Sequence, residues 1–182
     1  MKHFFLLLVA LLNLNANAQD TKKDADAVKT KMDAFASKTG TITKFVDFKL
    51  TGLKTTYGNV ENRIRKVSNS TSSAYFFQIE KEGKYGSTTA SVEFSDLIEV
   101  LKAIKALKES VANDISSNPD YMENKFTTVD GFQIGYYVNN GKATWYIKLE
   151  KYGSDNTIFL NNGDIIEEAF NSGKAKIDEL KK

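Results

Sequence analysis

The chain has 182 residues, of which 41% are hydrophobic and 12% aromatic. This is enough for one domain whose core is stable without disulfides. No disulfide can form, because the chain contains no cysteine. It carries 25 Lys and Arg against 23 Asp and Glu. This near balance counts against nucleic-acid binding, which draws most of its affinity from clustered Lys and Arg.

The first eighteen residues, MKHFFLLLVALLNLNANA, have the pattern of a secretory signal peptide. A basic start at Lys2 precedes an apolar run, and Ala16 and Ala18 form an A-x-A cleavage pattern before Gln19. The apolar run is shorter than the roughly 20 residues that a transmembrane helix needs. We therefore expect a protein with no membrane span, exported to the periplasm or outside the cell. A lipoprotein anchor is excluded because it needs a cysteine after the signal.

Removal of residues 1–18 also removes the only histidine, His3. The mature chain would then hold 25 − 1 = 24 basic residues, Lys2 being lost, and the same 23 acidic ones. Without His or Cys it cannot form a Ser-His-Asp or Cys-His catalytic site, nor the usual zinc, copper or haem sites. Paired carboxylates and hard cations such as calcium remain conceivable. We predict no catalytic residue, no metal site and no cofactor.

Hydrophobic periodicity predicts a short N-terminal helix, four strands and a second helix in the first part of the chain. Apolar residues recur at helical spacing between 22 and 38, and Gly40 is a good end signal for a helix that we place in residues 19–40. The strands are rich in β-branched and aromatic residues and are separated by Gly, Asn and Ser. We place the strands at 42–50, 59–67, 74–81 and 88–94 and the helix at 95–113.

The same order of elements then starts again. Residues 114–124, which contain the only proline, Pro119, are the predicted linker. The closing helix has an apolar stripe in which Gly173 would allow close packing. We place the strands at 125–129, 132–138, 143–151 and 156–160 and the helix at 163–182. The predicted fold is α+β: two tandem ββββα repeats, 41–113 and 125–182, forming one pseudo-twofold domain after the N-terminal helix.

An internal duplication supports this division. The phrase YFFQIEKEGKYGS is answered seventy positions later (145 − 75 = 70) by WYIKLEKYGS, and both copies alternate in the same phase. We therefore predict that the two halves superpose and that Tyr75, Phe77 and Ile79, together with their matches Trp145, Ile147 and Leu149, are buried beneath the two repeat helices. The matched positions are Tyr75 with Trp145, Phe77 with Ile147, Ile79 with Leu149, and Tyr85-Gly86-Ser87 with Tyr152-Gly153-Ser154 as hairpin turns.

A D-x-x-E motif opens each repeat helix, at 96–99 and at 164–167. Two carboxylates could act as an acid/base pair, but an Asp at the N-cap and a Glu three residues on also satisfy the first amide donors of a helix. We favour capping.

The segments YGSDN and NNGD look like calcium loops but lack the spacing of an EF-hand, so turn chemistry explains them. Tyr85 and Tyr152 could stack on a ligand or fold over the adjacent glycine. The N-x-S/T motif at Asn69 is a glycosylation site only if the source glycosylates its proteins, and otherwise indicates a polar loop.

The remaining candidate site is a sheet face. Strand alternation directs Phe76 and Tyr146 away from the helices, and Arg63 and Arg65, the only arginines, share one face of the neighbouring strand. Tyr137 has the comparable outward phase in the second copy. The alternatives are that the faces are partly covered, or that Arg63 pairs across strands with Glu80. The candidate ligand-binding residues are Arg63, Arg65, Phe76, Tyr137 and Tyr146.

The order of elements from Phe45 to Leu180 resembles the Whirly and PUR-alpha class of folds, and YFFQIEKEGKYG followed by VEFSDLIEVLKAI is similar in style to a PUR repeat. This resemblance implies two interlocked repeats and binding of single-stranded nucleic acid on the open strand face. Glu80 and Glu150 on that face would repel phosphate. The chain is also similar to small exported Bacteroidota proteins of unassigned function, and its element order also fits secreted tandem-repeat inhibitor proteins.

Together these features predict an exported, non-enzymatic binding or interaction protein whose partner is a protein or a small molecule. A carboxylate-dependent secreted hydrolase is the alternative of a different class; it would need two carboxylates roughly 5–10 Å apart in a cleft. Single-stranded nucleic-acid binding follows only from the resemblance in fold, and the charge of the mature chain disfavours it.

Overall fold

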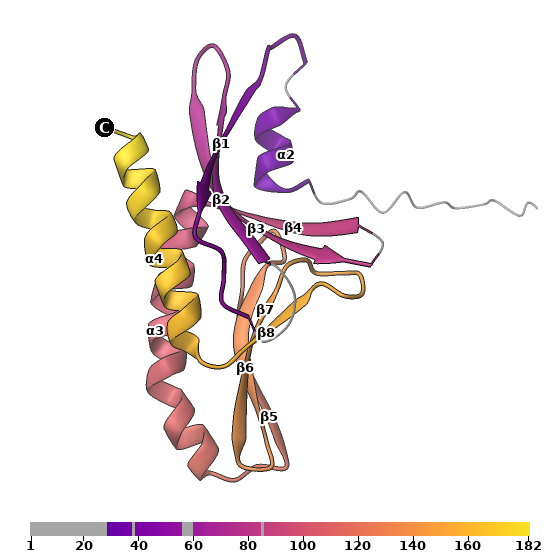
Figure 1. The fold of residues 1–182 in the computed structure, drawn as a ribbon, viewed down its shortest axis with the longest axis vertical. Coiled ribbons are helices and arrows are strands. Elements are labelled where there is room, and N and C mark those ends of the chain that lie inside the picture. The colour runs from indigo at the N-terminus through magenta and orange to yellow at the C-terminus, as the bar shows by residue number, and fades with distance from the viewer. Residues whose placement is uncertain (1–28, 38, 56–59, 85) are drawn as a thin grey trace, which may run out of the picture.

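The computed structural model describes residues 29–37, 39–55, 60–84 and 86–182, which form two antiparallel four-stranded sheets and three helices (Figure 1). This confirms the predicted α+β class with two tandem ββββα units after a short helix. The signal peptide prediction lies outside the described residues. Sheet A consists of β1 (Lys44–Leu50), β2 (Val60–Ser68), β3 (Ser73–Gly83) and β4 (Gly86–Glu93), and sheet B of β5 (Tyr121–Thr127), β6 (Gln133–Asn139), β7 (Lys142–Lys148) and β8 (Thr157–Leu160). The helices are α2 (Lys31–Ala36), α3 (Phe94–Ser116) and α4 (Gly163–Leu180).

Several boundaries differ from the sequence-based prediction: of the N-terminal helix placed in 19–40, α2 covers Lys31–Ala36, and both ends of the predicted linker move. Helix α3 continues to Ser116 and strand β5 begins at Tyr121, so the connection between the units is 117–120. Asp114 accepts a hydrogen bond from the hydroxyl of Tyr136, which holds the last turn of α3 on sheet B. Pro119 and its polar neighbours therefore mark a short turn. Within the described residues, no helix is both long and apolar enough to cross a membrane.

The central strands of the two sheets correspond residue by residue. Ile64 of β2 pairs with Phe77 of β3, and Ile134 of β6 pairs with Ile147 of β7. Both correspondences have a separation of seventy residues (134 − 64 = 70 and 147 − 77 = 70). The duplication seen in the sequence is thus a duplication of structure.

The edge strands correspond at other separations. Phe48 of β1 and Phe126 of β5 occupy equivalent places (126 − 48 = 78), as do Val92 of β4 and Ile158 of β8 (158 − 92 = 66). Loops of different length between the strands shift the numbering. This is why the separation of seventy residues holds only at the central strands.

The predicted inward phase of the central strands is confirmed. All six matched residues are buried, and Trp145 is only 5% exposed, with its ring 4.8 Å from that of Tyr136. Burial of large aromatic side chains supplies much of the hydrophobic free energy of a domain that has no disulfides. The six are Tyr75, Phe77, Ile79, Trp145, Ile147 and Leu149.

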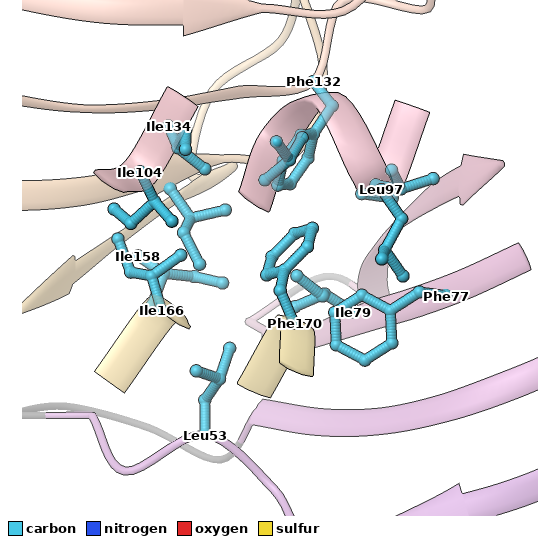
Figure 2. Packing of buried hydrophobic residues seen from close by; sticks show 14 of the residues in the cluster. Leu53, Phe77, Ile79, Leu97, Ile104, Phe132, Ile134, Ile158, Ile166 and Phe170 are labelled. Carbon is cyan, nitrogen blue, oxygen red and sulfur yellow. The ribbon is translucent and has the colours of Figure 1, made fainter. Parts of the chain in front are cut away.

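Helix α4, from the second unit, packs on sheet A of the first. The ring of Phe170 lies edge-on to Phe77 at 4.9 Å and 5.8 Å from Phe132, and Figure 2 shows it between these two rings. A Cβ on Gly173 would lie 2.8 Å from the Phe77 ring, so the close packing expected at this glycine is present. At the end of α4, the hydroxyl of Tyr75 donates to the carbonyl of Leu180 at 3.1 Å.

Helix α3 makes the reciprocal contact. Its C-terminal part lies on sheet B, where Tyr136 bonds to Asp114, while its N-terminal part stays on sheet A. The two helices also pack against each other on one side of both sheets (Figure 1). The units are therefore interlocked, because each sheet is covered by a helix of the other unit.

Candidate binding surface

The outer face of sheet A, on the side away from α3 and α4, contains both arginines in an ion-pair network. The Arg65 guanidinium donates to both oxygens of Asp47, at 2.7 and 2.6 Å. Arg63 donates to Gln78 at 2.8 Å and to Glu80 at 2.6 Å, which is the cross-strand pairing weighed above. These bonds hold the pKa values of Asp47 and Glu80 below their usual range. Neither arginine is left as an unpaired cation for a ligand.

Helix α2 covers this same face. The amide of Gln78 donates to the sulfur of Met32 at 3.7 Å, and the Lys31 ammonium bonds to Asp96 at 2.6 Å. Figure 1 shows α2 on the side of sheet A opposite to α3 and α4. Phe76 does point to the outer face, but it is 1% exposed. Its expected role as an exposed binding residue is therefore not met, because the outer face of sheet A is not open.

The two D-x-x-E motifs do not cap their helices as predicted. The N-caps are Glu93, which accepts from the Ser95 amide at 2.7 Å, and Asn162, which accepts from the Ile165 amide at 3.2 Å. Helix α3 begins at Phe94 and helix α4 at Gly163, so each aspartate lies inside the first turn, where it complements the helix dipole.

The second motif instead joins the two repeat helices. Asp164 and Glu167 of α4 both pair with Lys108 of α3, at 2.5 and 2.6 Å. These bonds raise the pKa of Lys108. An acid/base role is not supported, because both carboxylates are engaged by one ammonium group.

The second Tyr-Gly-Ser lies in a long loop, 149–156, and not in a tight hairpin turn. The Asn156 amide donates to the carbonyls of Glu150 and Tyr152, at 3.1 and 2.9 Å, which closes the loop. Lys81 of β3 bonds to the Asp155 carboxylate and to the carbonyl of Thr157. The acidic loop residues thus serve turn chemistry and a contact between the units. Tyr85, in the first copy, lies outside the described residues.

Other oxygen-rich positions are also explained locally. Asn69 accepts from the amides of Thr71 and Ser72, at 3.0 and 2.9 Å, in a polar turn. Across the described ranges, no three His, Cys, Asp or Glu side chains lie close enough together to hold a metal ion.

The outer face of sheet B differs, because a hollow of about 210 Å³ lies on it. Each of the four strands contributes two residues from one face of the sheet, at positions i and i+2 in β5, β7 and β8 and at i and i+4 in β6. We call this site the Gly135 hollow, and its lining residues are Glu123, Lys125, Gln133, Tyr137, Tyr146, Lys148, Thr157 and Phe159.

Gly135 is at the centre of these eight residues. It lies between Gln133 and Tyr137 along β6 and pairs with Lys125 and Tyr146 on the neighbouring strands. The missing side chain at this position therefore leaves the hollow.

The register explains the difference between the two sheets. Arg65 faces Phe76 in sheet A and Gly135 faces Tyr146 in sheet B, so Gly135 takes the place of Arg65. A Cβ at Gly135 would lie 2.4 Å from the Asn124 carbonyl oxygen, so the close approach of β5 requires glycine here.

Tyr146 forms the floor of the hollow. It is 5% exposed, and its hydroxyl reaches across β6 to donate to Glu123 at 2.6 Å. Lys125 donates to the other oxygen of Glu123 at 3.0 Å. The bond from Tyr146 is the largest cause that lowers the pKa of Glu123, and burial raises the pKa of Tyr146. Glu123 is therefore ionised and both its oxygens are occupied.

Aromatic rings stand at both sides of the hollow. Tyr137 stacks on Tyr121 with ring centroids 6.1 Å apart and planes at 24°. Tyr121 is 60% and Phe159 47% exposed. Lys148 lies at the end of the hollow away from Tyr137, beside Gln133 and Thr157 on the neighbouring strands, and makes no hydrogen bond or salt bridge with the described residues. This arrangement leaves apolar ring surface and an ammonium group available to a ligand.

A second hollow, of about 370 Å³, adjoins the first and shares Thr157 and Phe159 with it. Its other lining residues are Lys81, Asp155 and Ile158. Because Lys81 and Asp155 pair with each other, this hollow offers few free polar groups.

Of the five candidate residues, the structure brings Tyr137 and Tyr146 into the Gly135 hollow and leaves Arg63, Arg65 and Phe76 on the covered face of sheet A. Sequence reasoning missed the β5 side of the hollow. The alternating exposure of YMENKFT would have placed Tyr121, Glu123 and Lys125 together, had the strand been started at 121.

No known protein family and no curated protein sequence matches the chain. The proposal for its function therefore depends on the geometry described above.

Proposed function

We propose that this chain is an exported, non-enzymatic binding protein and that it binds its ligand in the Gly135 hollow. The observation that carries the proposal is the combination of exposed ring surface at Tyr121 and Phe159 with the unpaired ammonium of Lys148. Exposed aromatic side chains beside polar groups with free donors commonly mark recognition surfaces.

The hydrolase alternative is less well supported. Glycosidases use two carboxyl groups, and the acid of the pair needs a raised pKa. Glu123 is the one carboxylate among the residues that line the Gly135 hollow, and its pKa is lowered. A carboxylate that stays ionised and fully hydrogen-bonded cannot donate a proton to a leaving group.

Nucleic-acid binding, which follows from the resemblance to Whirly and PUR-alpha folds, is also less well supported. Single-strand binders stack bases on open aromatic faces in a positively charged groove. Here the central ring, Tyr146, is buried, and Arg63 and Arg65 are paired with carboxylates. The fold-level resemblance stays a prediction.

The site can be located by screening a library of small soluble compounds against the ¹⁵N-labelled mature chain, residues 19–182. We expect the amide shifts of hits to concentrate on β5–β8. Phe159→Ala should abolish these shifts. Phe45→Ala is the matched control, since Phe45 is also 47% exposed but lies on sheet A. Hits that map to sheet A, or no hits, would contradict the proposed site.

The proposal that the protein is not an enzyme is tested by an activity assay. The mature chain, incubated with a panel of chromogenic glycosides and esters, should give no more product than a blank. Turnover that disappears in Glu123→Gln would establish the hydrolase alternative instead.

Export is tested by intact-mass measurement of protein recovered from the periplasm or the medium. The expected N-terminus is Gln19. Recovered protein that still carries His3 would show that residues 1–18 are not a cleaved signal.

A further inference from the structure

We infer that the ligand of the Gly135 hollow is a single five- or six-membered ring that carries one carboxylate. This inference depends on the proposed function and specifies its ligand class. It follows from the charge of the hollow, its size and the position of its free donors.

The charge of the hollow favours one negative charge. Lys125 and Lys148 contribute two cations and Glu123 one anion, so the lining has a net charge of 2 − 1 = +1. Glu123 is already neutralised by its bonds to Lys125 and Tyr146. One uncompensated ammonium, that of Lys148, remains. A monoanion would complete the charge balance, whereas a phosphate dianion would add a second negative charge beside Glu123.

The free donors suit a planar group with two oxygens. Gln133 and Lys148 face each other directly across β6 and β7, so their Cβ atoms are about 4.5–5.5 Å apart. Neither side chain makes a hydrogen bond with the described residues. The amide of Gln133 and the ammonium of Lys148 can therefore each donate to one oxygen of the same carboxylate.

The size of the hollow limits the ligand to one ring. Its volume of about 210 Å³ is below the roughly 300–1,000 Å³ of sites for drug-sized molecules. Tyr137 and Phe159 flank it on β6 and β8, which are two strands, or about 9–10 Å, apart, and the two rings are also offset by two residues along the strands. A ring placed between them over Tyr146 would contact aromatic surface on several sides while its carboxylate reaches Gln133 and Lys148.

A ring with one carboxylate can be a uronic acid unit of a polysaccharide or a small aromatic acid. The test uses one probe of each kind, trigalacturonate and phenylacetate, each with a neutral partner, galactotriose and phenylacetamide. Each is titrated into the ¹⁵N-labelled mature chain. We expect one acidic probe to bind at least about tenfold more tightly than its neutral partner. Which acid binds identifies the source of the ring.

Two variants make the test specific. Lys148→Met should remove the preference for the acidic probe, whereas Lys142→Met, an exposed lysine on the same strand outside the hollow, should leave it unchanged. Thermal unfolding of both variants shows that they are folded.

The outcomes separate this inference from the proposed function. Three results overturn the carboxylate inference: equal binding of acidic and neutral probes, binding of galactose 6-phosphate that is tighter than that of both acidic probes, or no binding of any probe. In each case the binding site itself stands if the compound screen still maps to β5–β8. Micromolar binding of a mixed-sequence single-stranded DNA at about 0.15 M salt, lost in Phe159→Ala, overturns the carboxylate inference and restores the nucleic-acid alternative.

Discussion

Trp145 shows at the scale of one residue how closely sheet B packs against the start of helix α4. Its ring would lie 3.0 Å from a Cβ on Gly163, at the start of α4. Because truncating a large buried aromatic leaves a cavity, we expect Trp145→Ala to lower the free energy of unfolding by roughly 3–5 kcal/mol, measured by urea denaturation. The control, Tyr152→Ala, removes a side chain that is 75% exposed and should change it by less than about 0.5 kcal/mol. Equal effects would contradict the burial of Trp145.

Gly173 allows a second test at residue scale. Alanine is the better helix former by about 1 kcal/mol, but its Cβ would lie 2.8 Å from the Phe77 ring. We expect the cost of overpacking against Phe77 to exceed the gain in helix propensity, so that Gly173→Ala lowers the free energy of unfolding by roughly 1–3 kcal/mol. Adding Phe77→Leu should recover part of this loss, because it removes the clashing ring. A stabilised single variant would show that α4 lies farther from sheet A.

The Tyr146–Glu123 bond predicts a pH dependence of stability. The pKa of Glu123 is lowered in the folded protein from its usual value of 4.5. Its contribution to stability is therefore present above that value and is lost as the pH falls through the folded pKa. Removing the donor in Tyr146→Phe should make stability fall less steeply between pH 5 and 3.

Urea denaturation across this pH range measures the effect. Tyr137→Phe is the control, because the Tyr137 hydroxyl makes no hydrogen bond with the described residues. If the two variants show the same pH dependence, the bond from Tyr146 does not stabilise the Glu123 carboxylate.

At the scale of elements, α2 determines which sheet face is open. Removing residues 19–37 from the mature chain should leave both sheets and their helices folded, since α2 has no buried residue of its own. Phe76 would become exposed at a cost of roughly 1.5–3 kcal/mol. We expect a lower thermal midpoint and increased fluorescence of a hydrophobic dye, relative to the 19–182 chain. Unchanged dye binding would mean that α2 does not protect Phe76.

The element scale also shows what the sequence could and could not predict. Alternation and the seventy-residue repeat located the central strands and the buried phase of Phe77 and Ile147, because these depend on local pattern. The packing of α2 on the outer face of sheet A, through Met32 and Gln78, joins residues far apart in the sequence, so no strand pattern could reveal it. The hollow arises because Gly135 has no side chain. The sequence alone does not show that this glycine lies between β5 and β7 at the centre of a sheet face, so the hollow could not be predicted.

At the scale of the molecule, the interlocked arrangement, in which each sheet is covered by a helix of the other unit, predicts that neither half folds alone. A chain ending at 118 would keep sheet A but lose α4, leaving Phe77 without its contact to Phe170. We expect fragments 19–118 and 119–182 to be unfolded separately by circular dichroism and NMR, and to form a 1:1 complex with native dispersion when mixed. A fragment that folds on its own would contradict the interlocked arrangement.

The interlocked arrangement of the two units also bears on how such a protein could arise. A gene encoding one ββββα unit would yield a chain whose helix is buried only against a second copy, so the ancestral product would be an obligate homodimer. Tandem fusion of two copies makes this assembly independent of concentration. It also releases the two copies from identical sequence, because a substitution then alters one sheet only. A homodimer must have arginine or glycine at both equivalent positions, whereas the fused chain has Arg65 in one sheet and Gly135 in the other.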